Sequence, residues 1–445
     1  MKRLPLATIA LLLTVSFSRS LADDWPHWGG PEHDDIWRES GILTAFPEGG
    51  PKVLWRRPIH RGYSGPAVAD RKVFVFDRQM ADPKNAPGNA FDRGEIPGDE
   101  RLLCLDAETG EILWEKSEPV NYTVSYAAGP RTTPTIDGDR VYTVGAEGDL
   151  FCRSVKDGGV LWSKKLKELP GARTPTWGYA ASPLIDGNLL ICLAGGDGCV
   201  AIAFDKISGK EQWRALSAKE PGYCPPKIIE HGRKRMLLLW HPESANALDP
   251  ATGELIWTVP WQLRSGLSVP SPQLDGDHLL FTCFYNGSML LKLDGENTPE
   301  IVWRTEKASE KRTEHLHGII NSAVISDGHF YGACSYGEFR CLELVSGKRV
   351  WESLKPVGIE KPVRWGTVFV TPHEDRYFLF SETGELAIAK LSPAGYEEIS
   401  RAKVISPNGL DMRQRPIVWS HPTYAMKSCF VRNDSEIIRV DLSAE

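Results

Sequence analysis

Residues 105–114 read LDAETGEILW, and residues 248–257 read LDPATGELIW. Looser spellings of the same phrase close four further segments of the chain. The intervals between successive closing tryptophans are 48, 51, 44, 46 and 48 residues. A repeat of this length is typical of the blades of a β-propeller. The closing residues are Trp114, Trp162, Trp213, Trp257, Trp303 and Trp351.

Each repeat predicts a small antiparallel sheet. Residues 132–155, TTPTIDGDRVYTVGAEGDLFCRSV, give short alternating apolar strands separated by Asp-Gly and Glu-Gly turns. In the closing phrase, a short polar side chain bonds back to the turn amides, and Gly accepts a positive φ. One such sheet cannot bury both faces alone, so blades stack until a ring closes. We expect seven tryptophans to dock blade on blade: Trp55, Trp114, Trp162, Trp213, Trp257, Trp303 and Trp351.

The count predicts an all-β fold, an eight-bladed β-propeller of four-stranded antiparallel blades over residues 51–445. A degenerate seventh blade runs from Trp365 to about Ile399, where LSPAGYEEIS replaces the turn and the tryptophan. The eighth blade reaches Glu445 one strand short. The segment KVLWRRPI, with Trp55, precedes the first complete blade. We therefore expect this N-terminal strand to complete the last blade, which removes the open edges.

The first residues predict export. Lys2 and Arg3 precede an apolar run over residues 4–17, and small residues occupy the end of residues 1–22. This is the pattern of a secretory signal peptide cleaved after Ala22. No later stretch reaches the roughly 20 apolar residues of a membrane helix, and no cysteine lies near the cleavage position. We expect a soluble, periplasmic or secreted protein without a lipid anchor.

Two segments fall outside the repeats. Residues 23–50 form an irregular lead-in that contains WPHWGGPEHDD. Residues 78–100, rich in Pro, Gly and Asn, interrupt the first blade and predict an exposed loop. Loops on a rigid scaffold often carry function, so we expect binding at the axial face to include this one.

Charge and cysteine content narrow the choice of partner and compartment. The formal charge is −6, and loss of the three basic leader residues lowers it to −9, which argues against nucleic acid. The chain has nine cysteines, so at least one thiol is free. Cys104, Cys152 and Cys341 share one repeat position inside apolar strands, which favours small core residues over disulfides.

The pattern D-x-x-T-G-x-x-x-W, at residues 106–114 and again at 249–257, resembles the tryptophan-docking motif of the PQQ propeller repeat. The resemblance covers roughly residues 51–445. Two families carry this repeat: the quinoprotein alcohol dehydrogenases and the BamB-type scaffold of the outer-membrane β-barrel assembly machinery. The opening WPHWGGP also resembles that of exported PQQ-like propeller proteins. The resemblance implies the fold, and it leaves two functions open.

The dehydrogenases imply features that the sequence can be checked against. They commonly carry a vicinal cysteine pair, a calcium site with a nearby Asp as base, and in some cases a Cys-x-x-Cys-His haem site. We find no adjacent cysteines, no matching calcium segment and no Cys-x-x-Cys-His. We therefore expect a binding or interaction scaffold with no catalytic residues and no cofactor. The alternatives are an alcohol or sugar dehydrogenase using PQQ with calcium, and a carbohydrate-binding or carbohydrate-active propeller.

Candidate ligand-binding residues follow from the geometry of a propeller. The segments that enter the innermost strands converge at one end of the axis. Arginines there can bind a carboxylate, phosphate or sulfate, and aromatic rings can stack on a flat or sugar-like ligand. Alternatively, the arginines pair with acids such as Glu147 or Glu338, and the aromatics pack between blades. The candidates are Tyr63, Arg131, Trp177, Tyr223, His317, Arg364, Trp365, Arg413 and Arg415.

A metal site is not predicted. His315 and His317 project to one face if their segment is extended, but no third ligand at a comparable distance is evident. The expected ligand is an unknown protein or a small anionic or sugar-like molecule, bound by a monomer.

Overall fold

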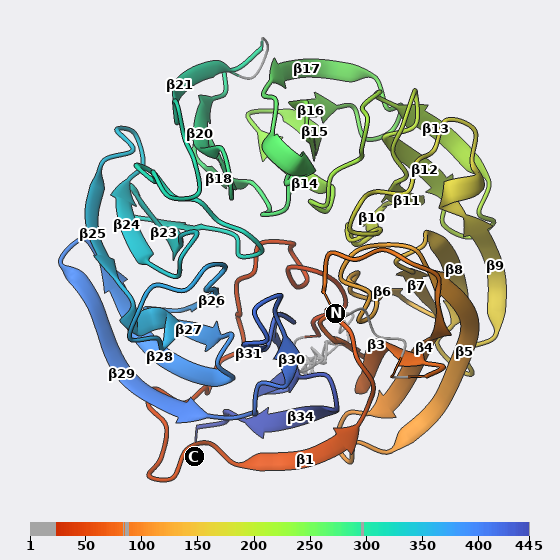
Figure 1. Ribbon diagram of the computed structural model, residues 1–445, viewed down its shortest axis with the longest axis horizontal. Helices are drawn as coiled ribbons and strands as arrows, with labels where there is room; N and C mark the ends of the chain where they lie inside the picture. Colours follow the sequence, from red (N-terminus) through yellow and green to blue (C-terminus); the bar gives the residue numbers. More distant parts are fainter. Residues whose placement is uncertain (1–23, 83, 85–88, 295–297, 445) are drawn as a thin grey trace, which may run out of the picture.

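Each repeat forms one four-stranded antiparallel blade, and eight such blades close a ring (Figure 1). The fold is taken from a computed structural model that describes residues 24–82, 84, 89–294 and 298–444. The predicted fold class is therefore confirmed. The signal peptide predicted over residues 1–22 lies outside the described residues.

Strands are given blade by blade, from the innermost strand outward. The first four blades are β2 (Ala67–Ala69), β3 (Lys72–Met80), β4 (Ile96–Asp106), β5 (Ile112–Tyr122); β6 (Thr135–Asp137), β7 (Arg140–Val144), β8 (Asp149–Ser154), β9 (Val160–Lys165); β10 (Leu184–Asp186), β11 (Leu189–Leu193), β12 (Ala201–Asp205), β13 (Glu211–Ala215); and β14 (Lys227–His231), β15 (Lys234–His241), β16 (Ser244–Leu248), β17 (Leu255–Pro260).

The next four are β18 (Gln273–Asp275), β19 (His278–Cys283), β20 (Gly287–Lys292), β21 (Glu300–Arg304); β22 (Val324–Ser326), β23 (His329–Ala333), β24 (Phe339–Glu343), β25 (Arg349–Ser353); β26 (Val368–His373), β27 (Arg376–Ser381), β28 (Glu385–Ser392), β29 (Gly395–Lys403); and β32 (Thr423–Ala425), β33 (Ser428–Arg432), β34 (Glu436–Asp441), β1 (Val53–Pro58). A hairpin of β30 (Gly409–Leu410) and β31 (Pro416–Ile417) and the short 3-10 helices η2 (Leu166–Glu168), η3 (Arg264–Gly266) and η4 (Lys355–Val357) lie between blades.

The ring closes as predicted. Strand β1 pairs antiparallel with β34, with Trp55 opposite Arg439 and Pro58 opposite Glu436. The last blade is thus built from both ends of the propeller, and its outermost strand comes from residues before the first blade (Figure 1).

The docking tryptophans lie on the turns of the next blade. The Trp114 indole donates to the Val155 carbonyl at 2.9 Å. A Cβ on Gly158, whose φ is +71°, would come within 2.8 Å of the Trp114 ring, so this turn requires glycine. The indoles of Trp55, Trp162, Trp213, Trp303 and Trp351 donate to carbonyls of the next blade in the same way, at 2.8–3.2 Å. Trp257 is buried in one core with Leu291 and Leu293 of the next blade.

The junction between the seventh and eighth blades lacks this contact. In the register of β28 and β29, Ser400 stands where the other blades carry tryptophan. The lead-in covers the position, because the Phe46 amide donates to the Ser400 hydroxyl at 2.9 Å. Trp37, 1% exposed, packs at the same junction against Phe378 and Tyr424, with ring centroids 5.1 and 4.9 Å apart.

The lead-in also crosses the central channel, where its red trace passes the middle of the ring (Figure 1). Trp25 forms a two-hydrogen-bond bridge with Val68 of β2, and the Pro26 carbonyl accepts from Ile136 of β6. Farther along, the Trp37 amide donates to the Pro372 carbonyl of β26. The lead-in therefore occupies the free edges of three innermost strands.

The inserted loop is shorter than the sequence suggested. Strands β3 and β4 extend into the predicted loop of residues 78–100, and Arg78 lies opposite Glu100 in the register of these two strands. The connection between them spans residues 81–95. Pro97 and Gly98 lie within β4, and residues of these types were read in the sequence as marking a loop.

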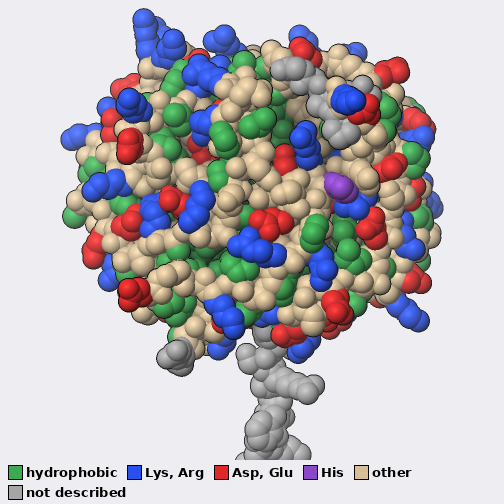
Figure 2. Space-filling model, turned by 60° about the horizontal axis from the view of Figure 1, so that its bottom comes forward, with side chains coloured by type: hydrophobic (Ala, Val, Ile, Leu, Met, Phe, Trp, Pro, Cys, Tyr) green, Lys and Arg blue, Asp and Glu red, His purple; other side chains and the backbone are tan. Residues whose placement is uncertain are grey.

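The cysteines confirm the prediction of small core residues over disulfides. On the face in Figure 2, basic and acidic side chains are interspersed, with apolar side chains in small groups between them. All nine cysteines are buried and unpaired. Within the described part of the chain, no helix has the length and hydropathy needed to cross a bilayer.

Removing a docking indole should destabilise the ring. Trp213 is 8% exposed and lies over Gly253 of the next blade. We expect Trp213→Ala to lower the free energy of unfolding by about 3–5 kcal/mol. In urea denaturation, Leu113→Ala, at an outer-strand side chain that is 52% exposed, should change it by less than about 0.5 kcal/mol. Equal losses in the two variants would contradict the docking role.

The lead-in should stabilise the junction that lacks a docking tryptophan. We expect Trp37→Ala to lower the free energy of unfolding by about 3–5 kcal/mol, although Trp37 lies outside the repeats. Amide exchange should accelerate first in β29 and β32, on the two sides of that junction. Arg38→Ala, at a neighbouring side chain that is 46% exposed, is the control. Unchanged exchange in Trp37→Ala would show that the junction is stable without the lead-in.

Candidate functional site

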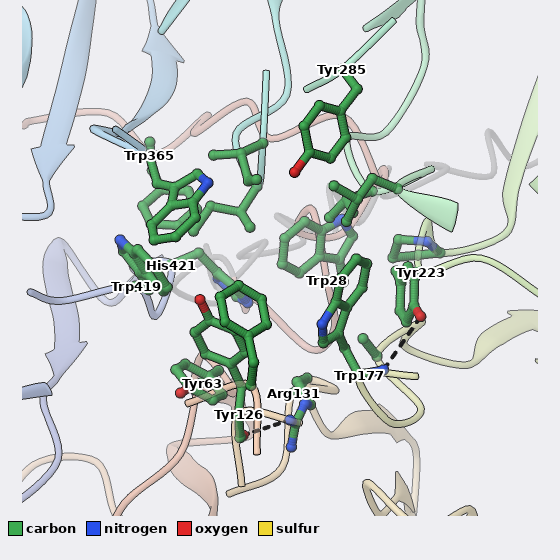
Figure 3. Close-up of a pocket in the computed structure, with 18 residues that line it drawn as sticks. Trp28, Tyr63, Tyr126, Arg131, Trp177, Tyr223, Tyr285, Trp365, Trp419 and His421 are labelled. Atoms are coloured by element: carbon green, nitrogen blue, oxygen red, sulfur yellow. Dashed lines mark hydrogen bonds between the residues drawn. The ribbon is translucent and has the colours of Figure 1, made fainter. Parts of the chain in front are cut away.

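A pocket of about 240 Å³ opens at one end of the ring axis. The segments that enter all eight innermost strands contribute to its wall, as the geometry of a propeller requires. Figure 3 shows Trp365, Trp419 and His421 on one side, Trp177 and Tyr223 on the opposite side, and Trp28 between them. Its lining is Trp28, Tyr63, Phe91, Tyr126, Arg131, Trp177, Ala180, Tyr223, Pro225, Leu267, Val269, Tyr285, Ile319, Ile320, Trp365, Phe369, Trp419 and His421.

Five of the nine candidates from the sequence lie in this wall: Tyr63, Arg131, Trp177, Tyr223 and Trp365. The structure therefore brings them together, and their role in ligand binding stays a prediction. The other four do not line the pocket: His317, Arg364, Arg413 and Arg415.

The aromatic rings form two groups across the pocket. On one side, Phe91 contacts Tyr126 and Trp365 at centroid distances of 5.2 and 6.4 Å, and Trp419 contacts Tyr126 at 6.2 Å. On the other side, Trp177 and Tyr223 lie 5.4 Å apart. The Trp28 indole between them donates to the Ser271 hydroxyl at 3.3 Å and meets His421 edge-on. These contacts hold the rings in place before any ligand binds.

Arg131 is the one charged group in the pocket lining among the described residues. Its guanidinium donates to the carbonyls of Gly129, Ser125 and Tyr126, the last two at 2.8 and 2.6 Å. It also lies 5.4 Å from the Tyr63 ring centroid. The side chain is thereby fixed by carbonyls and aromatic faces, and no ion pair to it occurs in the described chain.

Of the other three candidate arginines, Arg364 and Arg415 form ion pairs outside the pocket lining. Arg364 forms an ion pair with Glu310 and lies 4.5 Å over the Trp365 ring. Arg415 binds Glu382 and, at 3.2 Å, Asp411. The expected arginine–acid pairing thus occurs, but with acids other than Glu147 and Glu338. Glu147 instead pairs with Lys167 at 3.4 Å, and Glu338 accepts from the Tyr336 amide at 3.2 Å. Arg413 lies exposed on the β30–β31 hairpin.

His317 is fully buried, and its Nδ1 hydrogen-bonds the Phe284 carbonyl at 2.8 Å. Burial lowers its pKa to about 4, so the ring is neutral. The His315 ring stacks on the Trp303 ring with their centroids 4.6 Å apart, so His315 and His317 do not point to a common ligand. Among the described residues no group of three or more His, Cys, Asp or Glu side chains is placed to hold a metal.

Several lining residues were missed by the sequence reasoning. Trp28 comes from the lead-in and Phe91 from the inserted loop, so neither shares a repeat position with the candidates. Trp419 and His421 precede β32, and alignment of that short segment with the other blade entries would have found them. Tyr126 and Tyr285 lie in connections whose path the repeat does not specify.

The polar groups of the pocket are poor acids and bases near neutral pH. Burial raises the pKa values of Tyr63 and Tyr126 above their usual range, so both phenols keep their protons. Burial lowers the pKa of His421 to about 4. Its Nε2 hydrogen-bonds the Thr133 hydroxyl at 2.7 Å, and its Nδ1 bonds the Pro422 carbonyl at 3.1 Å. The arrangement suits stacking and apolar contact better than proton transfer.

The fold and the pocket define a PQQ-like repeat propeller with an aromatic axial site. The family described as outer membrane protein assembly factor BamB matches residues 98–352 and 241–402. These matches cover more than half of the chain, and the chain belongs to this family.

Single relatives support the fold at lower similarity. The outer membrane protein assembly factor BamB of Burkholderia pseudomallei (strain K96243) is 25% identical over 242 residues, which cover 52% of this chain. The chain spans 58% of the length of that relative. The crystal structure of BamB from Moraxella catarrhalis shares 14% identity over 88% of this chain and 99% of that chain, with a TM-score of 0.56. The crystal structure of a computationally designed protein, Ika8, shares 8% identity over 88% of this chain and 100% of that chain, with a TM-score of 0.53.

Acid should destabilise the protein partly through His421. Because its folded pKa of about 4 lies below the ordinary 6.5, its stabilising effect is complete above pH 6.5 and is lost as pH falls toward 4. We expect about 2 kcal/mol of this loss between pH 7.5 and 5. Urea denaturation at both pH values should show a smaller difference for His421→Gln than for the parent protein. The same difference in both proteins would contradict a neutral, buried His421.

Proposed function

We propose that this chain is a binding scaffold whose axial pocket captures bulky apolar side chains of a polypeptide partner. The observation that carries the proposal is the lining of the axial pocket. Ten of its 18 residues are Phe, Trp or Tyr, and Arg131 is its one charged group among the described residues. The family description, an assembly factor for outer membrane proteins, supports a polypeptide as the partner.

The chemistry of the wall favours apolar side chains over the alternatives. A sugar needs several hydrogen-bond partners beside its stacking ring, but the Tyr223 hydroxyl already bonds Glu220 at 3.1 Å, and both nitrogens of His421 are occupied. Leu267, Val269 and Ile319 offer only apolar contact. Burying such surface contributes roughly 25 cal/mol per Å².

The same wall is a poor fit for PQQ with calcium. Calcium takes six to eight oxygen ligands from carboxylates, amides and carbonyls. The described lining holds no Asp, Glu, Asn or Gln side chain. Glu310 and Glu382 are bound by Arg364 and Arg415, and Glu220 accepts from the Thr176 and Tyr223 hydroxyls. Binding without catalysis is therefore the function that these residues support best.

Residues 89–95 of the inserted loop contribute to the rim of the pocket. Phe91 is 39% exposed, while the Phe91 carbonyl accepts from the Ser125 hydroxyl at 3.1 Å and Arg93 donates to the Thr176 carbonyl at 2.8 Å. These bonds hold residues 91 and 93 beside the pocket, and the exposed part of the Phe91 side chain is left for a partner. The proposal assigns this loop to partner capture, as expected from its position.

The test uses two labelled ten-residue peptides that are identical except at two positions. Both positions are Phe in the first peptide and Ser in the second. Fluorescence anisotropy should show tighter binding of the Phe peptide, because only its rings fill the pocket. Trp177→Ala should weaken that binding at least tenfold, as is common for a buried aromatic contact. Phe91→Ala should also weaken it, whereas Leu410→Ala, 50% exposed and outside the lining, should change it less than twofold.

Two further titrations separate the alternatives. Purified protein is mixed with PQQ and calcium, and dye-linked oxidation of alcohols and aldoses is followed. Stoichiometric uptake with turnover would replace the proposal with a quinoprotein dehydrogenase. Competition of the Phe peptide by a neutral oligosaccharide, with no preference between the two peptides, would replace it with a sugar-binding site.

A further inference from the structure

A second cavity of about 370 Å³ lies between the lead-in and the innermost strands of blades four to seven. Its wall includes residues of β14, β18, β22 and β26, with Asp34, Asp35 and Ile36 of the lead-in opposite them. Trp28 and His421 line both this cavity and the axial pocket, so the lead-in divides the channel into two chambers. The chambers differ in chemistry, because several acidic side chains and Lys227 line the second, whereas Arg131 is the one charged group that the described residues place in the lining of the first.

Lys227 and Asp35 are opposite charges in the wall of this cavity, and no ion pair to either occurs among the described residues. Lys227 of β14 makes one hydrogen bond, to the Pro272 carbonyl at 3.3 Å. The Asp35 carboxylate accepts no hydrogen bond within the described ranges. No ion pair joins Asp35 to Lys227 among the described residues, although each feels the charge of the other. The two groups therefore face a common space without touching.

Burial disfavours both charges. It raises the pKa of Asp35 to about 6 and lowers the pKa of Lys227, and in each case burial outweighs the attraction between the two groups. A close ion pair would have shifted both pKa values in the opposite directions. Both side chains are half-buried, so within the cavity water or a ligand must supply the contacts that the two charges lack.

The remaining acids of the cavity are already compensated. Asp34 is bound by Arg38, and Glu230 lies 3.9 Å from Arg235 with a side chain that is 79% exposed. Asp275 is exposed as well. Asp34 and Glu230 thus face arginines and Asp275 is exposed, which leaves Asp35 and Lys227 as the half-buried charges of the wall without an ion pair among the described residues.

We propose that this cavity binds a small zwitterion of the α-amino-acid class, with its carboxylate on Lys227 and its ammonium on Asp35. A metal ion would be repelled by Lys227, and a phosphate would be repelled by Asp35 and Asp34. A ligand that carries both charges satisfies both side chains at once. Ser322 and Thr371 of the same wall offer hydroxyls to its backbone or side chain. The cavity volume lies within the range of small-molecule sites.

The experiment is calorimetric titration of the full chain, free of leader, with glycine, serine and glycylglycine. Acetate and methylamine, which carry one charge each, are the matched probes. We expect at least one zwitterion to bind at least tenfold more tightly than either single-charge probe. Binding no tighter than acetate or methylamine, or no heat from any zwitterion at millimolar concentration, would overturn the proposal.

Variants locate the site. Lys227→Met and Asp35→Asn should each weaken zwitterion binding at least tenfold, whereas Glu254→Gln, at an exposed side chain outside the cavity wall, should change it less than twofold. Equal binding by all three variants would also overturn the proposal. Circular dichroism, and anisotropy with the Phe peptide, are run on the same variants. Unchanged peptide binding shows an intact axial pocket, so failure of this proposal is distinguishable from failure of the proposed function.

Discussion

The structure depends on one repeated contact, the indole of one blade lying on the turn glycine of the next. The contact joins two requirements. The turn needs a residue with positive φ, and the ring needs a surface without a Cβ, as at Gly110 under Trp55, where a Cβ would come within 2.7 Å. The Asp106 carboxylate fixes the same turn by accepting from the Thr109 amide at 2.8 Å. Because each contact joins neighbouring blades, the eight sheets are stable only as a ring.

This contact explains why the sequence predicted the whole fold but only part of the pocket lining. Glycine, tryptophan and the short polar residue recur at fixed spacing, because every blade must solve the same packing problem. The number of blades and the closure by β1 followed from that spacing. The blade entries also converge by geometry, which placed Tyr63, Arg131, Trp177, Tyr223 and Trp365 in one wall.

What the sequence could not reveal lies outside the repeat. Trp28 and Phe91 reach the pocket through segments with no internal register, so only the folded chain shows where they go. The partners of Arg364 and Arg415 were likewise hidden, because Glu310 and Glu382 are 54 and 33 residues away in sequence. Ion pairs between loops carry no periodic signal. The lead-in was expected to be irregular, yet it supplies Phe46 and Trp37 at the one junction that lacks a docking indole.

The lead-in links stability to the chemistry of the channel. A propeller channel exposes the free edges of its innermost strands, and these backbone groups require hydrogen bonds. The lead-in satisfies three of the edges and at the same time places Trp28 across the axis. On one side of Trp28 the wall is made of blade-entry side chains, which here are aromatic. On the other side it is made of strand edges and of Asp35 and Lys227, which are polar. One crossing segment therefore gives the two chambers walls of different chemistry without changing any blade.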